Sequence, residues 1–171
     1  MPNVWNNSKQ LLLTVATPPS LFFPTSGVKI FLAGSIITGK NNWRDKAAEH
    51  IKQHWFDNEE NSDNITIYNP VRTEKWTDDL ENEQMTWDTS MISVADYVIL
   101  HLTGSSVSPV SLLELGLLSN DPRLFVSMDD SYVKNNIVKL YYSRYGQKNI
   151  YSSWFDSIEC ISRNHLTKKD L

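Results

Sequence analysis

The chain has 171 residues, of which 40% are hydrophobic and 21% charged, an ordinary composition for a single soluble domain. Its net charge of −4 offers no basic surface for a phosphate backbone, so we expect small ligands as partners and no nucleic acid polymer. No stretch approaches the ~20 apolar residues of a membrane span, and the single cysteine, Cys160, excludes an intrachain disulfide.

Residues 1–27 are predicted to form an N-terminal extension that lies on the domain, because Asn, Ser and Pro cluster there between short apolar patches. One patch, Leu11 to Ala16, resembles the apolar region of a signal peptide, but it spans only six residues before Pro18 and Pro19. A lone cysteine also fits a reducing compartment. We therefore expect a cytoplasmic protein with one domain over residues 28–171.

From Val28 onward, short apolar runs alternate with helical patterns. The apolar runs predict strands at 28–33, 65–68, 95–102 and 123–128, and a short fifth strand at 149–151. The helical patterns start at the capping residue Asn42 and run to 55, then cover 82–95, the residues from 108 onward, 132–145 and 154–163. This alternation predicts an α/β fold, with a five-stranded parallel sheet and helices on both faces.

The helix that starts near Ser108 carries one carboxylate in an apolar segment. Val110, Leu113, Glu114 and Leu117 follow at i, i+3, i+4 and i+7, so we expect Glu114 inside the stripe that faces the core. Burial of an unpartnered carboxylate is costly, and a desolvated Glu is suited to act as acid, base or nucleophile. A structural role, in which the carboxylate is bound by a Lys, an Arg or a backbone amide, explains the same position equally well.

A second carboxylate lies in an apolar stripe of the helix at 82–95, where Asp88 stands between Trp87 and Met91. Two carboxylates in unequal surroundings are typical of enzymes that cleave a bond at the anomeric carbon of a sugar. One of them attacks or stabilises positive charge, and the other transfers a proton. We assign Glu114 as the nucleophile, because it projects from a helix beside the strand ends, and Asp88 as the proton donor.

Parallel sheets bind ligands outside the carboxyl ends of their strands, so the segments that follow the predicted strands should converge on one site. These segments are 34–35, 69–72, 103–111 and 129–130. Ser108 and Pro109 are typical of a helix start, with Ser as the cap. The amides there, with hydroxyls such as that of Ser111, suit a phosphate or a sugar oxygen, and plain capping is the alternative.

The sequence predicts no cofactor and no metal. The segment from Gly34 to Gly39 matches neither of the glycine-rich fingerprints that bind ATP or dinucleotides. His50 and His54 are four residues apart on one predicted helix, but no acidic or Cys ligand lies near them in the sequence.

Six segments, in order between Lys29 and Gly146, resemble the nucleoside 2-deoxyribosyltransferase-like proteins. That family has a flavodoxin-like, Rossmann-like fold and is related to deoxynucleoside 5′-monophosphate N-hydrolases. The most specific segment is Ser-Pro-Val-Ser-Leu-Leu-Glu-Leu-Gly at 108–116. The other five are 31–36, 69–72, 84–88, 95–96 and 132–146.

The resemblance implies a mechanism and a set of site residues. Glu114 would attack C1′ of a 2′-deoxynucleoside and expel the base, and a second base would then reverse the step, as in nucleotide salvage. Asp88 matches the acid that protonates the departing base. Asn136 matches an Asn that a neighbouring subunit contributes, which implies a homo-oligomer with shared active sites. Together with the strand-end segments, this interpretation makes the following residues substrate-binding: Gly34, Ser35, Asn69, Arg72, Trp87, Ser108, Ser111 and Asn136.

Three positions depart from the family pattern. Val71 stands where an Arg is usual before Arg72, and Asn135 stands where a Gly is usual. Ser108 replaces the Asp that transferases for free nucleosides carry six residues before the nucleophile, and a hydroxyl suits a 5′-phosphate better than a carboxylate would. At this position the chain resembles the nucleotide hydrolases. The resemblance as a whole nevertheless makes a transferase that acts on deoxynucleosides and free bases the leading hypothesis. A hydrolase for deoxynucleotides and a non-catalytic nucleotide-binding protein are the alternatives.

Overall fold

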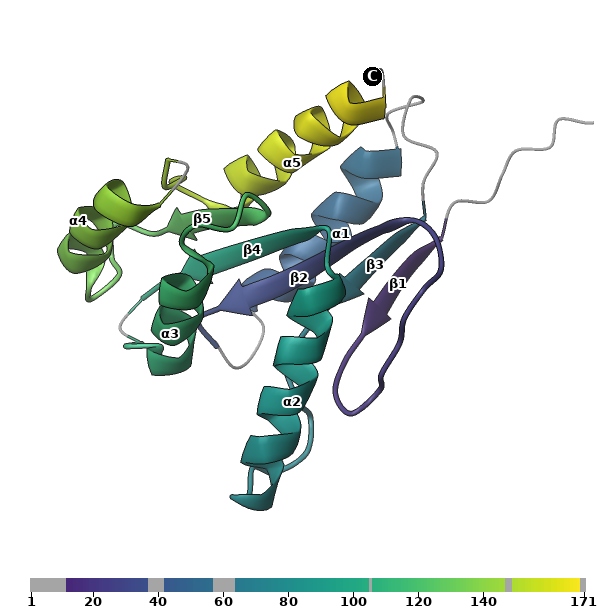
Figure 1. Cartoon of the computed structure of the whole chain (residues 1–171), viewed down its shortest axis with the longest axis horizontal. Helices are drawn as coiled ribbons and strands as arrows, with labels where there is room; N and C mark the ends of the chain where they lie inside the picture. Colours follow the sequence, from purple (N-terminus) through teal and green to yellow (C-terminus); the bar gives the residue numbers. More distant parts are fainter. Residues whose placement is uncertain (1–11, 37–41, 57–63, 105, 147–148, 170–171) are drawn as a thin grey trace, which may run out of the picture.

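The computed structural model describes residues 12–36, 42–56, 64–104, 106–146 and 149–169. Its centre is a five-stranded sheet in which every strand pairs parallel with its neighbours, in the order β1-β3-β2-β4-β5 (Figure 1). The strands are β1 (Leu13–Ala16), β2 (Val28–Gly34), β3 (Ile65–Tyr68), β4 (Tyr97–Leu102) and β5 (Leu124–Met128). The predicted α/β class with a parallel sheet is confirmed.

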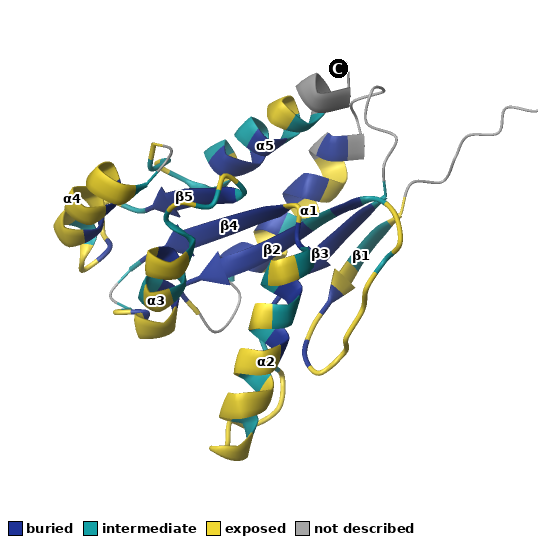
Figure 2. Ribbon diagram, in the orientation of Figure 1, coloured by how far each residue is buried: buried dark blue, intermediate teal, exposed yellow. Residues whose placement is uncertain are grey.

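Helices cover both faces of the sheet, as predicted. The cluster on one face includes Trp87 and Met91 of α2 (Asp79–Val94), Leu115 of α3 (Pro109–Leu118), and Val138 and Tyr142 of α4 (Asn135–Tyr145). The cluster on the other face combines α1 (Trp43–Phe56) with α5 (Trp154–Lys169). The strands between these layers are mostly apolar, and Figure 2 shows the three central ones as buried. None of the described helices combines the length and apolar character that a bilayer crossing needs.

The fifth strand is not the predicted one. Leu13–Ala16, from the predicted N-terminal extension, forms the edge strand β1 beside β3, so the sheet begins before Val28. Tyr151, from the predicted strand at 149–151, makes only an isolated bridge to Ser127. An edge strand gains its place through main-chain pairing with one neighbour. Of the four residues of β1 only Ala16 is buried, so the side-chain pattern did not mark this apolar patch as a strand of the sheet.

The segment after β1 is held against α2 and β3 by two hydrogen bonds. The Trp87 indole Nε1 donates to the carbonyl of Ser20 at 2.8 Å, and the Tyr68 hydroxyl donates to the carbonyl of Phe22 at 3.0 Å. The N-terminal segment is therefore part of the packing that fixes α2 on the sheet.

The orientation of α3 differs from the predicted one. Val110, Leu113 and Leu117 are 62%, 69% and 86% exposed, whereas Ser111 and Leu115 face the sheet. The segment is apolar on every side, so periodicity did not identify its buried face. Glu114 consequently lies at the border of the buried face, half-buried, and not within an apolar stripe.

Candidate active site

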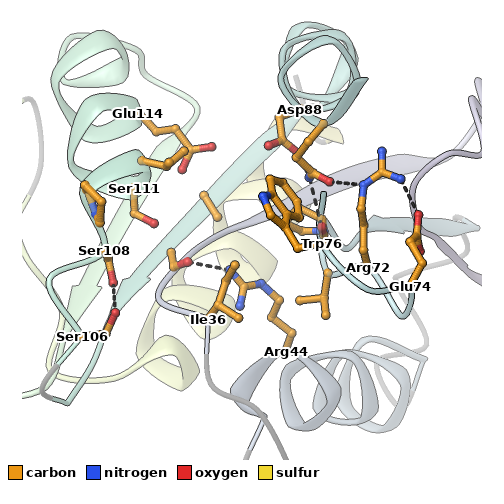
Figure 3. A pocket seen from close by; sticks show the side chains of 17 residues that line it. Ile36, Arg44, Arg72, Glu74, Trp76, Asp88, Ser106, Ser108, Ser111 and Glu114 are labelled. Atoms are coloured by element: carbon orange, nitrogen blue, oxygen red, sulfur yellow. Dashed lines mark hydrogen bonds and ion pairs between the residues drawn. The ribbon is translucent and has the colours of Figure 1, made fainter. Parts of the chain in front are cut away.

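A cavity of about 490 Å³ opens beside the carboxyl end of β2, between α2, α3 and the loop that follows β3 (Figure 3). This is the edge of a parallel sheet at which ligands bind. Six of the residues predicted for the site lie on its wall: Gly34, Arg72, Asp88, Ser108, Ser111 and Glu114. The strand ends thus bring together residues that are up to 80 positions apart in the chain.

Glu114 from α3 and Asp88 from α2 point toward one another across this cavity (Figure 3). Burial raises the pKa of Glu114 to about 7, and repulsion by Asp88 adds to the increase while Arg44 opposes it. Burial also raises the pKa of Asp88 to about 6, against a hydrogen bond from Gln84 and the charges of Arg44 and Arg72. Two carboxyl groups in one cavity titrate as a pair, so near pH 6.5 they hold about one proton between them.

Arg44 is a site residue that the sequence analysis missed. It lies in the first turn of α1, where Asn42 caps the helix through its Oδ1 and the Arg44 amide, as predicted. The guanidinium is buried and donates to the carbonyls of Leu32, Gly34 and Ser35 at 2.9, 2.7 and 2.9 Å.

Burial lowers the pKa of Arg44 to about 10, so the group remains charged beneath both carboxylates. Its positive charge favours their ionised forms, and three strand-end carbonyls fix its position. Arg44 directly follows the buried Trp43, and sequence spacing alone does not show whether an Arg at such a position is buried or lies on the surface.

Three serine hydroxyls connect the end of β2 with the start of α3. The Ser108 hydroxyl lies 2.7 Å from that of Ser35 and 2.9 Å from that of Ser106. Ser108 is the N-cap residue of α3 and Pro109 is its first residue, as predicted. Ser108 has a left-handed φ of 48°, and its hydroxyl makes no capping hydrogen bond to the helix. Ser35 is completely buried behind the wall, where its Oγ accepts from the Thr103 amide at 3.1 Å. Ser106, Ser108 and Ser111 line the cavity itself.

Gly34 is on the wall for a steric reason. Its φ is 125°, and a Cβ at this position would lie 2.0 Å from the carbonyl oxygen of His101 in β4. Only glycine permits this approach of the two strands. Gly34 thus holds β2 close to β4 at the strand end that borders the cavity.

Four residues of the predicted site do not line this cavity: Ser35, which is buried behind the wall, and Asn69, Trp87 and Asn136. Asn69 follows β3, and its Oδ1 accepts from the Val71 amide at 3.2 Å, which holds the turn. Trp87 is 2% exposed and belongs to the core, since its indole is oriented by the bond to Ser20. Asn136 is exposed at the start of α4, where it lines a separate hollow of about 410 Å³.

Arg72 was predicted to bind substrate but is occupied by other partners, whereas Trp76 was not predicted but faces the cavity. Arg72 lies on the wall, but its side chain is only 3% exposed and is paired with Glu74 and Glu83, both at 2.5 Å. Trp76 was not predicted, yet its indole lines the cavity and is 51% exposed. An exposed Trp offers a flat apolar surface of the kind that stacks on an aromatic ligand. A Trp in an irregular loop carries no periodic signal that would have identified it.

The predicted absence of a metal rested partly on His50 and His54. His50 is packed against Phe155, with ring centroids 4.4 Å apart, and its Nε2 lies 3.4 Å from Glu159 of α5. The side chain of His54 lies outside the described part of the chain. Among the described residues, no three His, Cys, Asp or Glu side chains are grouped so as to hold a metal ion.

Comparison with known proteins adds one finding to this geometry. A family model described as nucleoside 2-deoxyribosyltransferase like matches residues 27–132, more than half of the chain. The match contains every residue that lines the cavity and ends before Asn136. No curated protein sequence matches the chain.

Proposed function

Because the chain belongs to the nucleoside 2-deoxyribosyltransferase-like family, we propose that it cleaves the N-glycosidic bond of 2′-deoxynucleosides and transfers the deoxyribose to another base. The observation that carries this proposal is the pair of carboxylates, Glu114 and Asp88, that face one another across the cavity. Both have raised pKa values, so the pair shares about one proton near neutral pH. The pKa of Glu114, about 7, exceeds that of Asp88, about 6, so this proton is mostly on Glu114, and the proposed reaction proceeds through the less populated form, in which Glu114 is ionised and Asp88 is protonated.

In the proposed first step, an ionised Glu114 oxygen attacks C1′ while the bond from C1′ to the base nitrogen breaks. The bonding electrons leave with the base, which receives the proton of Asp88. The sugar is then held as an ester of Glu114. In the second step, a nitrogen of the incoming base attacks C1′, its proton passes to Asp88, and Glu114 leaves as a carboxylate.

Arg44 supports the nucleophile in this scheme. Its charge lies beneath both carboxylates and favours the ionised form of Glu114, which burial alone disfavours. The exposed indole of Trp76 provides a surface on which a departing or incoming base can stack.

A hydrolase acting on deoxynucleoside 5′-monophosphates is the second candidate, and one feature of the wall favours it. Ser106, Ser108 and Ser111 present hydroxyls to the cavity beside the start of α3, and no carboxylate stands at position 108. Hydroxyls beside a helix N-terminus suit a phosphate group, whereas an Asp there would repel it. Water would then replace the second base in the attack on C1′.

We also propose that the enzyme is a homo-oligomer. α3 and α4 present exposed apolar side chains on their outer sides, which no part of the described chain covers. Between the two helices lies a hollow of about 420 Å³ lined by residues such as Leu115, Ile137 and Tyr141. A second copy would cover this face and could bring its Asn136 to the catalytic cavity, as the family resemblance implies. The exposed side chains are Val110, Leu113, Leu117, Ile137, Leu140, Tyr141 and Tyr145.

One experiment separates the candidate functions. The protein is incubated with deoxyinosine or deoxycytidine, or with their 5′-monophosphates, in the presence and absence of free adenine, and the products are resolved by chromatography. Formation of deoxyadenosine identifies a transferase, and release of free base from the monophosphates without exchange identifies a hydrolase. Ligand binding without base release from any of the four substrates would contradict both and favour the non-catalytic alternative.

A further inference from the structure

Asp88 is held by a chain of hydrogen bonds that begins at Arg72. The Arg72 Nε donates to the Gln84 Oε1 at 2.6 Å, and the Gln84 Nε2 donates to the Asp88 Oδ1 at 2.8 Å. The same Nε2 donates to the carbonyl of Pro70 at 3.1 Å. Gln84 and Asp88 are four residues apart on α2, and thus adjacent on one side of the helix.

The guanidinium fixes which way the Gln84 amide faces. Arg72 has only N–H donors, so the Gln84 atom that meets it must be the oxygen. The amide nitrogen must then face Pro70 and Asp88, where its two hydrogens find two acceptors. If the Gln84 amide were rotated by 180°, its NH₂ group would face the N–H donors of Arg72 and no hydrogen bond could form. Arg72 therefore sets the donor-to-acceptor direction of all the hydrogen bonds between it and Asp88.

This direction determines which oxygen of Asp88 carries the proton. Oδ1 accepts a hydrogen bond from Gln84, and the oxygen that accepts this bond is the poorer site for a proton. The proton of the carboxyl group therefore belongs on Oδ2. An acid that transfers a proton must present it in one direction. Here the direction is set by Arg72, in the loop after β3, which is 12 residues from Gln84 in the chain and acts on Asp88 through it.

Arg72 itself is poorly placed to bind an anionic substrate. Each of its three nitrogens already donates to a partner, Gln84, Glu74 or Glu83. One positive charge is thus surrounded by two carboxylates, and its side chain is 3% exposed. A phosphate group would have to displace one of these carboxylates.

We infer that Arg72 and Gln84 are positioning residues, which hold the Asp88 carboxyl group with one oxygen bound and the other free to exchange a proton. The inference rests on the proposed function, in which Asp88 is the proton donor. It replaces the substrate-binding role that the sequence suggested for Arg72. The charge of Arg72 acts through the orientation of Gln84, so the two residues should behave as one unit.

The test measures the pKa of the Asp88 carboxyl group directly. Aspartate labelled with carbon-13 at the carboxyl carbon is followed by NMR from pH 4 to 9, and the Asp88 signal is assigned from its loss in Asp88→Asn. Gln84→Met removes the donor and keeps the length of the side chain. Because a hydrogen bond to the ionised form lowers a carboxyl pKa, we expect the pKa of Asp88 to rise by about one pH unit in Gln84→Met.

Arg72→Met should raise the pKa of Asp88 in the same direction, because the Gln84 amide loses its anchor and Asp88 loses a nearby cation. The double variant Arg72→Met with Gln84→Met decides whether Arg72 acts through Gln84. We expect its shift to be clearly smaller than the sum of the two single shifts. Fully additive shifts would overturn the inference, and so would an unchanged Asp88 pKa in Gln84→Met.

Kinetics provide an independent reading on whichever substrate the protein cleaves. The alkaline limb of the pH profile of kcat/KM should move upward in Gln84→Met and in Arg72→Met. A tenfold increase in KM in Arg72→Met, with no movement of this limb, would identify Arg72 as a substrate contact and refute its positioning role. If the unmodified protein cleaves nothing, the proposed function fails, but the NMR titration still decides whether the chain of bonds controls Asp88.

The matched control is Gln53→Met in α1. The Gln53 Nε2 donates to the Glu49 Oε1 at 2.8 Å, also four residues apart on a helix, but this pair is exposed and outside the cavity wall. Its replacement should move neither the Asp88 titration nor the pH profile. If Gln84→Met does not fold, as judged by circular dichroism, Gln84→Glu retains the contact with Arg72 and places a carboxylate beside Asp88. In Gln84→Glu the pKa of Asp88 should rise above its value in the unmodified protein by more than the roughly one unit expected for Gln84→Met, because a second carboxylate lies beside it. An unchanged pKa of Asp88 would again overturn the inference.

Discussion

Replacing Glu114 by Gln should stabilise the folded protein at pH 8 while it abolishes base release. Burial and the repulsion of Asp88 raise the pKa of Glu114 from 4.5 to about 7, so the folded state binds this proton more tightly than the unfolded state does. A carboxyl group of this kind contributes fully to stability below pH 4.5, and the contribution is lost as the pH rises toward 7. Glu114, the proposed nucleophile, is therefore a source of instability above neutral pH.

The pKa values set the size of the effect. The difference between about 7 and 4.5, at about 1.36 kcal/mol per pH unit, gives an upper bound near 3 kcal/mol at pH 8. Contact with solvent in the cavity screens part of this energy, so we expect about 2 kcal/mol. For a chain of this size, that corresponds to an increase in Tm of about 4–8 °C.

The assay is urea and thermal unfolding of the unmodified protein and Glu114→Gln at pH 8 and at pH 4.5, monitored by circular dichroism. We expect Glu114→Gln to be the more stable at pH 8 and the two proteins to converge at pH 4.5. Glu81→Gln, on an exposed turn of α2, removes the same charge at the surface and should change stability by a few tenths of a kcal/mol. Equal stability of Glu114→Gln and the unmodified protein at both pH values would refute the reasoning. Normal base release by Glu114→Gln would exclude Glu114 as the nucleophile.

Three further expectations follow from the same site. The pH profile of base release should be bell-shaped with its maximum near pH 6.5, because the active pair holds one proton; a rate that is flat from pH 5 to 8 would contradict this. Asp88→Asn should slow release most for bases that leave poorly without protonation, and equal slowing for all bases, measured by chromatography, would argue against an acid role. Leu117→Glu places a charge on α3 at a position that is 86% exposed, and it should lower the sedimentation coefficient toward that of a monomer. Glu81→Gln should leave the coefficient unchanged, and an unchanged coefficient in Leu117→Glu would contradict the proposed interface.

The sequence was sufficient to predict the layers of the fold, because β2, β4 and β5 are mostly apolar runs separated by helical patterns. It was insufficient for β1, an edge strand in which only Ala16 is buried. It also misjudged α3, since a helix that is apolar on nearly every side has no unique buried face. Glu114 therefore lies at the border of the buried face, on the cavity wall, and not within an apolar stripe.

The candidate site was predicted only in part. Glu114 and Asp88 could be noticed as single carboxylates among apolar neighbours, although the spacing argument for Glu114 assigned the wrong buried face to α3. The rule for strand ends located the loops around them. Arg44 and Gln84 depend on bonds to carbonyls and side chains that come together only in the folded chain. Trp87 shows the opposite error, because it follows Gln84 and precedes Asp88 in sequence but its side chain points about 100° away from that of Asp88 around the helix and packs in the core.

The position of β1 matters for anyone who trims the chain to the segment shared with its family. A fragment that starts at residue 27 would lose β1 and the carbonyls that accept from the Tyr68 hydroxyl and the Trp87 indole. β3 would become the edge strand of the sheet, and its unpaired backbone amides and carbonyls, with its apolar side chains, would be open to pairing with other molecules. Such a fragment should aggregate, and its inactivity would say nothing about the chemistry of the intact protein.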